Sequence, residues 1–240
     1  MDLHTLGLVE YCELFDDKDF VVRKRTDIGI VQFGILLYLK GLSFRAVRDI
    51  LMVLVVSVSH VAVWKWFQRF GEKVTPITFL ENGAMPSTVV VDETCVQIGS
   101  LKFFLYAAIC PETKRLIYFD IYPTRNYLAT LSFFRAMTTL YSKAPDLVVV
   151  DGGHWYPHAL RRLGIQHKVV SGDIRNYIER WYQTLKDRLR CFDIYFPHKK
   201  RFEHVLNWLY AYVFFYNRIR KHMSLDGKTP LKYHTEVTQS

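Results

Sequence analysis

The sequence has only four cysteines, and no two of them are close together. Cys12, Cys95, Cys110 and Cys191 are scattered along 240 residues. Zinc ribbons and disulfide frameworks both need closely spaced cysteines, so this spacing argues against them and is typical of a protein in a reducing cytosol.

Long apolar runs are also missing. The apolar stretches 28–39 and 50–58 are shorter than the roughly 20 residues that a helix needs to cross a bilayer. The chain does not open with the charged, apolar and small-residue segments of a secretory signal. We therefore expect a soluble, cytoplasmic protein with no membrane partner.

Acidic residues are fewer than basic ones. The chain has 32 Lys and Arg against 23 Asp and Glu, a formal net charge of +9. A basic surface favours polyanions such as nucleic acid, although a merely solvated basic face has the same composition. The charge is consistent with a DNA partner and does not decide it.

Two Val-rich segments each run into an aspartate. Residues 89–91 precede Asp92, and residues 148–150 precede Asp151, which is followed by two glycines. Short β-branched runs are typical of strands buried on both faces, and Asp-Gly-Gly predicts a turn. Because α/β folds build sites at strand ends, we expect two carboxylates at one edge of a sheet.

A third carboxylate, Glu179, lies in residues 174–190, which have a helical pattern. Three carboxylates about 4 Å apart repel by roughly 4 kcal/mol per pair at an effective dielectric near 20, so they converge only around cations. Hard oxygen ligands suit Mg²⁺ or Mn²⁺, and two such ions can assist displacement at a phosphate. Asp92, Asp151 and Glu179 are therefore the candidate catalytic and metal-binding residues, with an ordinary solvated helix as the alternative for Glu179.

The long helix also has basic residues beside Glu179. At 100° per residue, Arg175, Glu179 and Lys186 lie within about 40° of one another on one face. We expect Arg175 and Lys186 to contact a phosphate backbone.

Residues 23–75 predict three short helices, the second capped by Ser43 and the third by Ser59. A basic last helix is typical of a helix-turn-helix module, with a plain three-helix bundle as the alternative, since residues 52–56 lack the glycine of a tight turn. If the module binds DNA, the contacting side chains are His60, Lys65, Gln68 and Arg69.

The remaining pattern completes the domain plan. We expect an arm at 1–22, the helical module at 23–75, a linker at 76–87, a catalytic domain at 88–200 and a C-terminal helix with a basic tail at 201–240. Within the catalytic domain, three antiparallel strands precede a helix, a strand, a helix, a strand and the long helix. That is the order of an RNase H-like α/β domain, a mixed five-stranded sheet with flanking helices, in which the first and fourth strands are neighbours.

These motifs together resemble the DDE transposases of insertion sequences, in particular the archaeal branch of the insertion-sequence six family. The matching stretches are Tyr38 to Arg45, Val63 to Phe70, Val91 to Thr94, Val150 to Tyr156, Asn176 to Arg180 with Lys186, Tyr216 to Arg218, His222 to Leu225 and Thr229-Pro230.

The resemblance implies that Asp92, Asp151 and Glu179 bind the metal and that Lys186 contacts DNA near the cut. It implies cutting at terminal inverted repeats, strand transfer into target DNA by a replicative cointegrate route, and a homodimer or larger assembly. Asp151 and Glu179 are 28 positions apart, a shorter gap than is usual in that family. The alternative acids are Asp173, Asp187 and Glu203.

The same fold would also serve a nuclease or resolvase, and a domesticated DNA-binding protein would keep the fold without the chemistry. Glu93 is left out of the triad because neighbouring residues of a strand point to opposite faces. Trp155 and Tyr156 either stack on a flipped base or anchor a short helix by packing.

Overall fold

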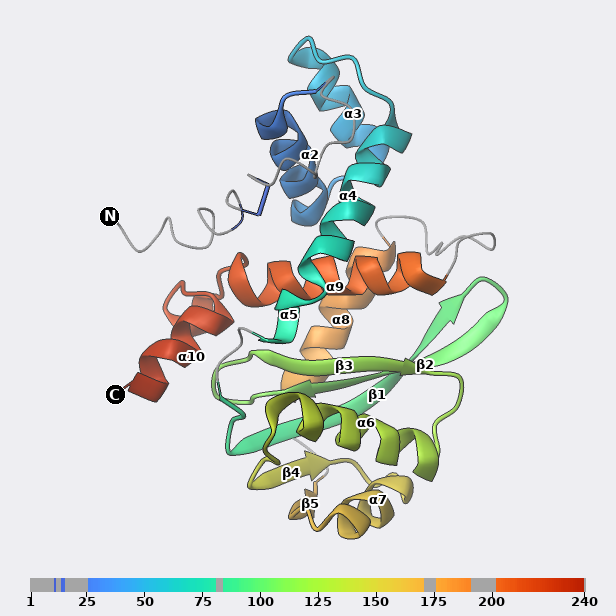
Figure 1. Cartoon of the computed structure of the whole chain (residues 1–240), viewed down its shortest axis with the longest axis vertical. Coiled ribbons are helices and arrows are strands. Elements are labelled where there is room, and N and C mark those ends of the chain that lie inside the picture. Colours follow the sequence, from blue (N-terminus) through green and yellow to red (C-terminus); the bar gives the residue numbers. More distant parts are fainter. Residues whose placement is uncertain are drawn as a thin grey trace.

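The computed structural model describes residues 11, 14–15, 26–80, 84–170, 176–190 and 202–239. Figure 1 shows a helical module at one end, a sheet with its helices at the other, and α9 crossing between them. The elements are α2 (Ile28–Lys40), α3 (Phe44–Val53), α4 (His60–Val74), α5 (Ile77–Leu80), β1 (Thr88–Ile98), β2 (Leu101–Ile109), β3 (Leu116–Tyr122), α6 (Tyr127–Tyr141), β4 (Leu147–Val150), α7 (Trp155–Leu163), β5 (His167–Val169), α8 (Asn176–Arg190), α9 (Phe202–Arg218), the 3₁₀ turn η2 (Met223–Leu225) and α10 (Pro230–Gln239).

The helical module consists of α2, α3 and α4, and both expected caps are confirmed. The Ser43 hydroxyl accepts a hydrogen bond from the Ala46 N–H, and the Ser59 hydroxyl accepts one from the Ala62 N–H, each at 3.1 Å. Val55 has a φ of 62° in the turn between α3 and α4. A β-branched residue thus takes the left-handed conformation for which a glycine was missing, at a local cost in strain.

The five strands form one mixed sheet in the order β3-β2-β1-β4-β5. β1 pairs antiparallel with β2, and β2 with β3, whereas β4 pairs in parallel with both β1 and β5. The RNase H-like order predicted from the sequence is therefore confirmed, including the contact between the first and fourth strands.

Helices cover both faces of this sheet. Val89 and Val91 belong to the apolar cluster that includes side chains of α6 and α7, whereas Val90 belongs to the cluster that includes α8 and α9. Because successive side chains of a strand point to opposite faces, a continuous valine run is what a strand buried on both sides requires.

α9 joins the helical module to the sheet. The apolar cluster on its side extends without a break from α2 and α4 through α9 to the sheet. The Trp208 indole N–H of α9 donates to the Tyr38 hydroxyl of α2 at 2.8 Å. At the other end, the Asn217 side chain bonds both the N–H and the C=O of Leu116 at 2.9 Å, as a neighbouring strand would.

Several segments outside the expected elements are also ordered. Part of the expected 76–87 linker forms α5, whose Phe79 is buried against Phe119 and Tyr210. α10 lies in the expected basic tail. Within the expected arm, the Tyr11 hydroxyl donates to the Gln32 carbonyl at 2.6 Å. No helix in the described ranges has both the length and the apolar character needed to cross a membrane.

Gly71 sets the close approach of α4 to α9. A Cβ at this position would lie 2.1 Å from the Asn207 carbonyl oxygen, whereas one at Gly34 in α2 would make ordinary contacts of 3.4 Å and longer. We therefore expect Gly71→Ala to lower the free energy of unfolding by at least about 2 kcal/mol, because backbone cannot move aside as a side chain can.

The matched control is Gly34→Ala, also within a helix, which we expect to be neutral or to stabilise by up to about 1 kcal/mol. Urea denaturation followed by circular dichroism measures both variants. Equal effects at the two positions would contradict this account of the helix crossing.

Candidate active site

The parallel pairing of β1 with β4 sets the two aspartates side by side. Val90 is opposite Val149 in the register, and Asp92 and Asp151 each follow two positions further along their strands. Asp92 is only 8% exposed, and Asp151 is half-buried. Two residues that are 59 positions apart thus lie side by side on neighbouring strands, as predicted, but only Asp151 follows the end of its strand, because β1 continues beyond Asp92 to Ile98.

Backbone N–H groups orient both carboxylates. Oδ1 of Asp92 accepts from the N–H of Glu93, and Oδ1 of Asp151 accepts from the N–H of Gly153, each at 2.9 Å. A Cβ on Gly153 would lie 2.9 Å from the Trp155 ring and 3.0 Å from Asp151 Oδ1. The glycine lets the turn close tightly around Asp151.

α8 packs on the Asp92 side of the sheet. The Tyr182 hydroxyl lies 2.6 Å from the Asp92 carbonyl oxygen, to which it donates, and 3.0 Å from that of Leu105. Glu179 is one helical turn before Tyr182 and is exposed. The helix therefore brings Glu179 to the same side of the sheet as Asp92.

The three carboxylates do not form a closed ligand set. Within the described ranges, no three acidic, histidine or cysteine side chains gather closely enough to hold a metal ion. The paired aspartates nevertheless offer hard oxygen donors from two rigid strands, which is the donor chemistry of a Mg²⁺ or Mn²⁺ site. They fit one part of such a site, with Glu179 on the neighbouring helix.

Glu93 is a buried acid that the sequence pattern left outside the triad. Its side chain is 3% exposed, accepts a hydrogen bond from the Tyr156 hydroxyl of α7, and lies 3.8 Å from Arg125. Glu93 therefore points to the α6 and α7 face, away from α8. Burial raises its pKa to about 7, with a further increase from the nearby Asp92 and Asp151, although Tyr156 and Arg125 oppose this change.

The candidate DNA-contacting residues have different surroundings. Lys65 on α4 and Lys186 on α8 are exposed, and His60 and Arg69 are half-buried. Gln68 faces α9 instead, where its amide bonds the His204 carbonyl at 3.4 Å and the Asn207 amide at 3.5 Å. Arg175 lies outside the described residues.

Two of the three alternative acids lie within the described residues. Asp187 is exposed on α8 and accepts from the Gln183 amide at 2.7 Å. Glu203 is exposed in the first turn of α9. Asp173 lies outside the described residues.

A family model for the DDE domain matches residues 86–206, which include both aspartates and Glu179. This chain belongs to the DDE transposase family. An uncharacterized protein of Methanocaldococcus jannaschii is 31% identical to it over 198 residues, which cover 82% of this chain and 90% of that protein.

Two further matches cover less of this chain. An uncharacterized protein of Aquifex aeolicus is 38% identical over 72 residues, 29% of this chain and 58% of that protein. A chain of the simian T-cell lymphotropic virus intasome, solved in complex with PP2A regulatory subunit B56 gamma, has a TM-score of 0.51 at 16% identity. That match covers 63% of this chain and 55% of the viral one, and it shows that the fold is shared.

The raised pKa of Glu93 makes the stability of the DDE domain depend on pH. The folded state holds the Glu93 proton up to about pH 7, whereas the unfolded state releases it near the ordinary value of 4.5. The contribution of Glu93 is therefore complete below about pH 4.5 and is lost as the pH rises towards 7.

As the pH rises from 4.5 to 7, we expect the free energy of unfolding of Glu93→Gln to increase relative to that of the wild type by on the order of 2 kcal/mol. The reason is that the glutamine amide resembles the protonated acid and does not ionise. Urea denaturation in EDTA from pH 4.5 to 8 measures the difference, with the exposed Glu112→Gln as the control. A difference that does not change with pH would contradict the assigned environment of Glu93.

Proposed function

We propose that this chain is the transposase of an insertion sequence, which cuts DNA at terminal inverted repeats and joins the freed 3′ ends to target DNA. The observation that carries the proposal is a pair of aspartates at equivalent positions on adjacent parallel strands, inside a DDE domain. The 31% identical relative from Methanocaldococcus jannaschii is compatible with the archaeal branch of the insertion-sequence six family.

In this proposal Asp92 and Asp151 hold divalent cations, and Glu179 completes the ligand set from α8. Glu179 is exposed on α8, and Tyr182, one turn later on the same helix, donates a hydrogen bond to the β1 backbone. The bound ions, two in the proposed mechanism, supply activation of the attacking oxygen and stabilisation of charge on the phosphate.

The protein's own residues then position the DNA strand. The backbone N–H groups of Glu93 and Gly153 hold the aspartates in a fixed orientation, so little rearrangement is needed when DNA binds. Lys186 is exposed two turns after Glu179, where a cation can pair with phosphates that flank the reacting one.

The helical module is proposed to bind the terminal repeats. α4 exposes Lys65, with His60 at its start, while its second half packs on α9. Pairing of two ends requires at least two copies of the chain in this scheme, so a dimer or larger assembly is part of the proposal.

Asp151→Asn tests the chemistry. It keeps the side-chain size but removes the charge that holds a cation, so we expect cleavage and strand transfer to fall at least about 100-fold with binding retained. The assay uses DNA with the repeats that flank the gene, with Mg²⁺ or with EDTA, and gel analysis of cut and joined strands.

Asp146→Asn is the matched control, an exposed aspartate near the opposite end of β4, and it should react as the wild type does. If the wild type and both variants bind the repeats specifically but none of them cuts DNA, the proposed enzyme activity is refuted and the chain is a DNA-binding protein without catalysis.

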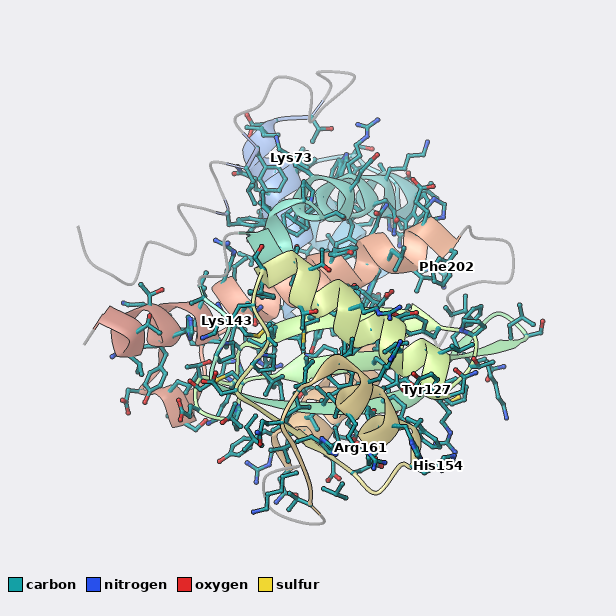
Figure 2. The ribbon with its side chains drawn as sticks, turned by 60° about the horizontal axis from the view of Figure 1, so that its bottom comes forward. Lys73, Tyr127, Lys143, His154, Arg161 and Phe202 are labelled. Atoms are coloured by element: carbon teal, nitrogen blue, oxygen red, sulfur yellow. The ribbon has the colours of Figure 1, made fainter. Side chains whose placement is uncertain are left out.

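Lys65→Ala tests the helical module. If Lys65 contacts a phosphate, affinity should fall for all sequences and the slope of log K against log salt should decrease by about 1. Fluorescence anisotropy over a salt series measures this. Lys143→Ala is the charge-matched control, because Lys143 is exposed after the end of α6, and Figure 2 shows it apart from Lys73 of α4. Equal losses in the two variants would refute a specific role for α4.

A further inference from the structure

A hollow of about 590 Å³ opens between the start of α6 and α7. Figure 2 shows that Tyr127 and His154 lie away from the helical module, where Lys73 is. The residues that line this hollow, called here the aromatic pocket, are Arg125, Asn126, Tyr127, His154, Trp155, His158 and Arg162. Its size is that of pockets that hold small organic ligands.

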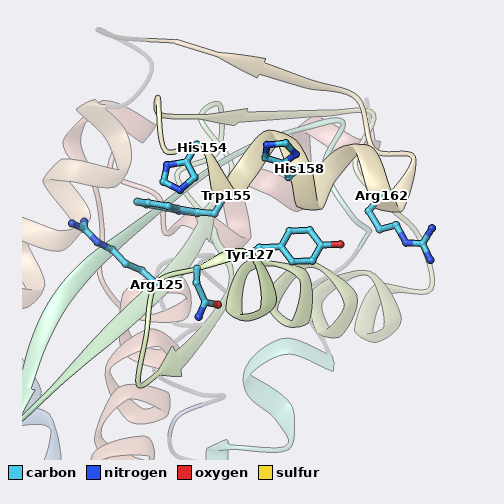
Figure 3. Close-up of a pocket in the computed structure, with 7 residues that line it drawn as sticks. Arg125, Tyr127, His154, Trp155, His158 and Arg162 are labelled. Carbon is cyan, nitrogen blue, oxygen red and sulfur yellow. The ribbon is translucent and has the colours of Figure 1, made fainter.

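The lining of the aromatic pocket favours an anion with a flat ring. Figure 3 shows the Arg125 and Arg162 guanidinium groups towards its two ends, with the rings of Trp155 and Tyr127 between them. No carboxylate is among the lining residues. Guanidinium groups pair with phosphates, and exposed aromatic faces stack on bases, so one nucleotide presents both features that this lining recognises.

Arg125 is held in place before any ligand binds. Its guanidinium lies 5.4 Å from the centre of the Trp155 ring and 5.5 Å from that of Phe104, and it is 3.8 Å from the buried carboxylate of Glu93. A prearranged cation and ring lose less freedom on binding, which favours a defined ligand over loose attraction.

The aromatic pocket adjoins the aspartate pair. Trp155 begins α7 four residues after Asp151, and its ring lies against Gly153 in the same turn. Arg125 contacts Glu93, whose side chain points to the opposite face of β1 from that of Asp92, so the pocket approaches the aspartates through Gly153 and Asp151. A DNA strand at the aspartates therefore has the pocket within reach of its neighbouring nucleotides.

We propose that the aromatic pocket binds one unpaired deoxynucleotide of the DNA beside the cut, with the base stacked on Trp155 and Tyr127 and the phosphate paired with Arg125 or Arg162. This inference rests on the proposed function, because it takes DNA as the substrate. A base inside a duplex has both faces covered, so only an extruded or unpaired nucleotide can enter.

The test compares terminal-repeat duplexes that are fully paired with duplexes that have one unpaired 2-aminopurine nucleotide beside the cleavage position. Affinity is measured in Ca²⁺, which keeps the DNA uncut, and stacking is followed by quenching of the 2-aminopurine fluorescence. We expect the wild type to bind the unpaired substrate at least fivefold more tightly, in line with alanine substitutions of stacked aromatic residues.

Trp155→Ala and Tyr127→Ala should each reduce this preference and the quenching, with less than a twofold change for paired DNA. Tyr127 is 37% exposed at the start of α6, so its variant stays informative if Trp155→Ala does not fold. Arg161→Gln is the control, since Arg161 is exposed on α7 but does not line the pocket.

An unchanged preference in both aromatic variants, or an equal loss for paired and unpaired DNA, would overturn the pocket and indicate contact with a duplex backbone. Cleavage by the wild type without any preference for the unpaired substrate would refute the proposed nucleotide pocket and leave the proposed transposase function standing. A preference for the unpaired substrate that depends on Trp155, without cleavage in Mg²⁺, would refute the proposed cleavage activity and support the nucleotide pocket.

Discussion

The parallel pairing of β1 with β4 is the constraint on which the candidate site depends. A shift of one residue in this register would exchange the two faces of β4 and turn Asp151 away from Asp92. Val148 and Val150 pack in one apolar cluster and Val149 in the other, so a shift in one direction would put Asp151 into the fully buried position of Val150, where a carboxylate is costly. The position of the aspartates therefore follows from hydrophobic packing on the two faces of the sheet, without any attraction between the aspartates themselves.

The packing of the sheet brings together acidic side chains whose negative charges repel one another. Asp92 and Glu93 lie within β1, beside Asp151 at the end of β4, and the raised pKa of Glu93 is partly a consequence of the two aspartates. Hydrogen bonds from neutral donors offset part of this repulsion. Each aspartate accepts a hydrogen bond from a backbone N–H, and Glu93 accepts one from the Tyr156 hydroxyl. A cation near Asp92 and Asp151 would lower it further, because opposite charge stabilises the ionised forms. The same fold that sets the acids together thus favours the binding of a metal.

Local sequence signals were sufficient for most of the fold. The valine runs and the Ser43 and Ser59 caps are patterns within a few residues, and the strand order was predicted from the succession of elements, which is that of an RNase H-like domain. The structure confirms all three. Contacts between distant residues could not be read in this way. Gln68 has the helical spacing of an exposed residue but bonds α9 across 136 positions, and Glu93 gains Tyr156 from 63 positions away. α10 was missed because residues 230–239 have only two aliphatic side chains, Leu231 and Val237. The aromatic pocket was missed because Tyr127 and Trp155 come from separate helices.

In the proposed ligand set, Glu179 has to approach the two aspartates. α8 itself is fixed, because Ile178, Trp181 and Leu185 are buried and Tyr182 bonds the β1 backbone. Pulling one large apolar side chain out of the core costs about 1.5 to 3 kcal/mol, so moving the whole helix would be costly. Rotation about the side-chain bonds of an exposed glutamate costs far less. Closure of the ligand set is therefore expected to be a change in the Glu179 side chain, with the sheet and α8 unchanged.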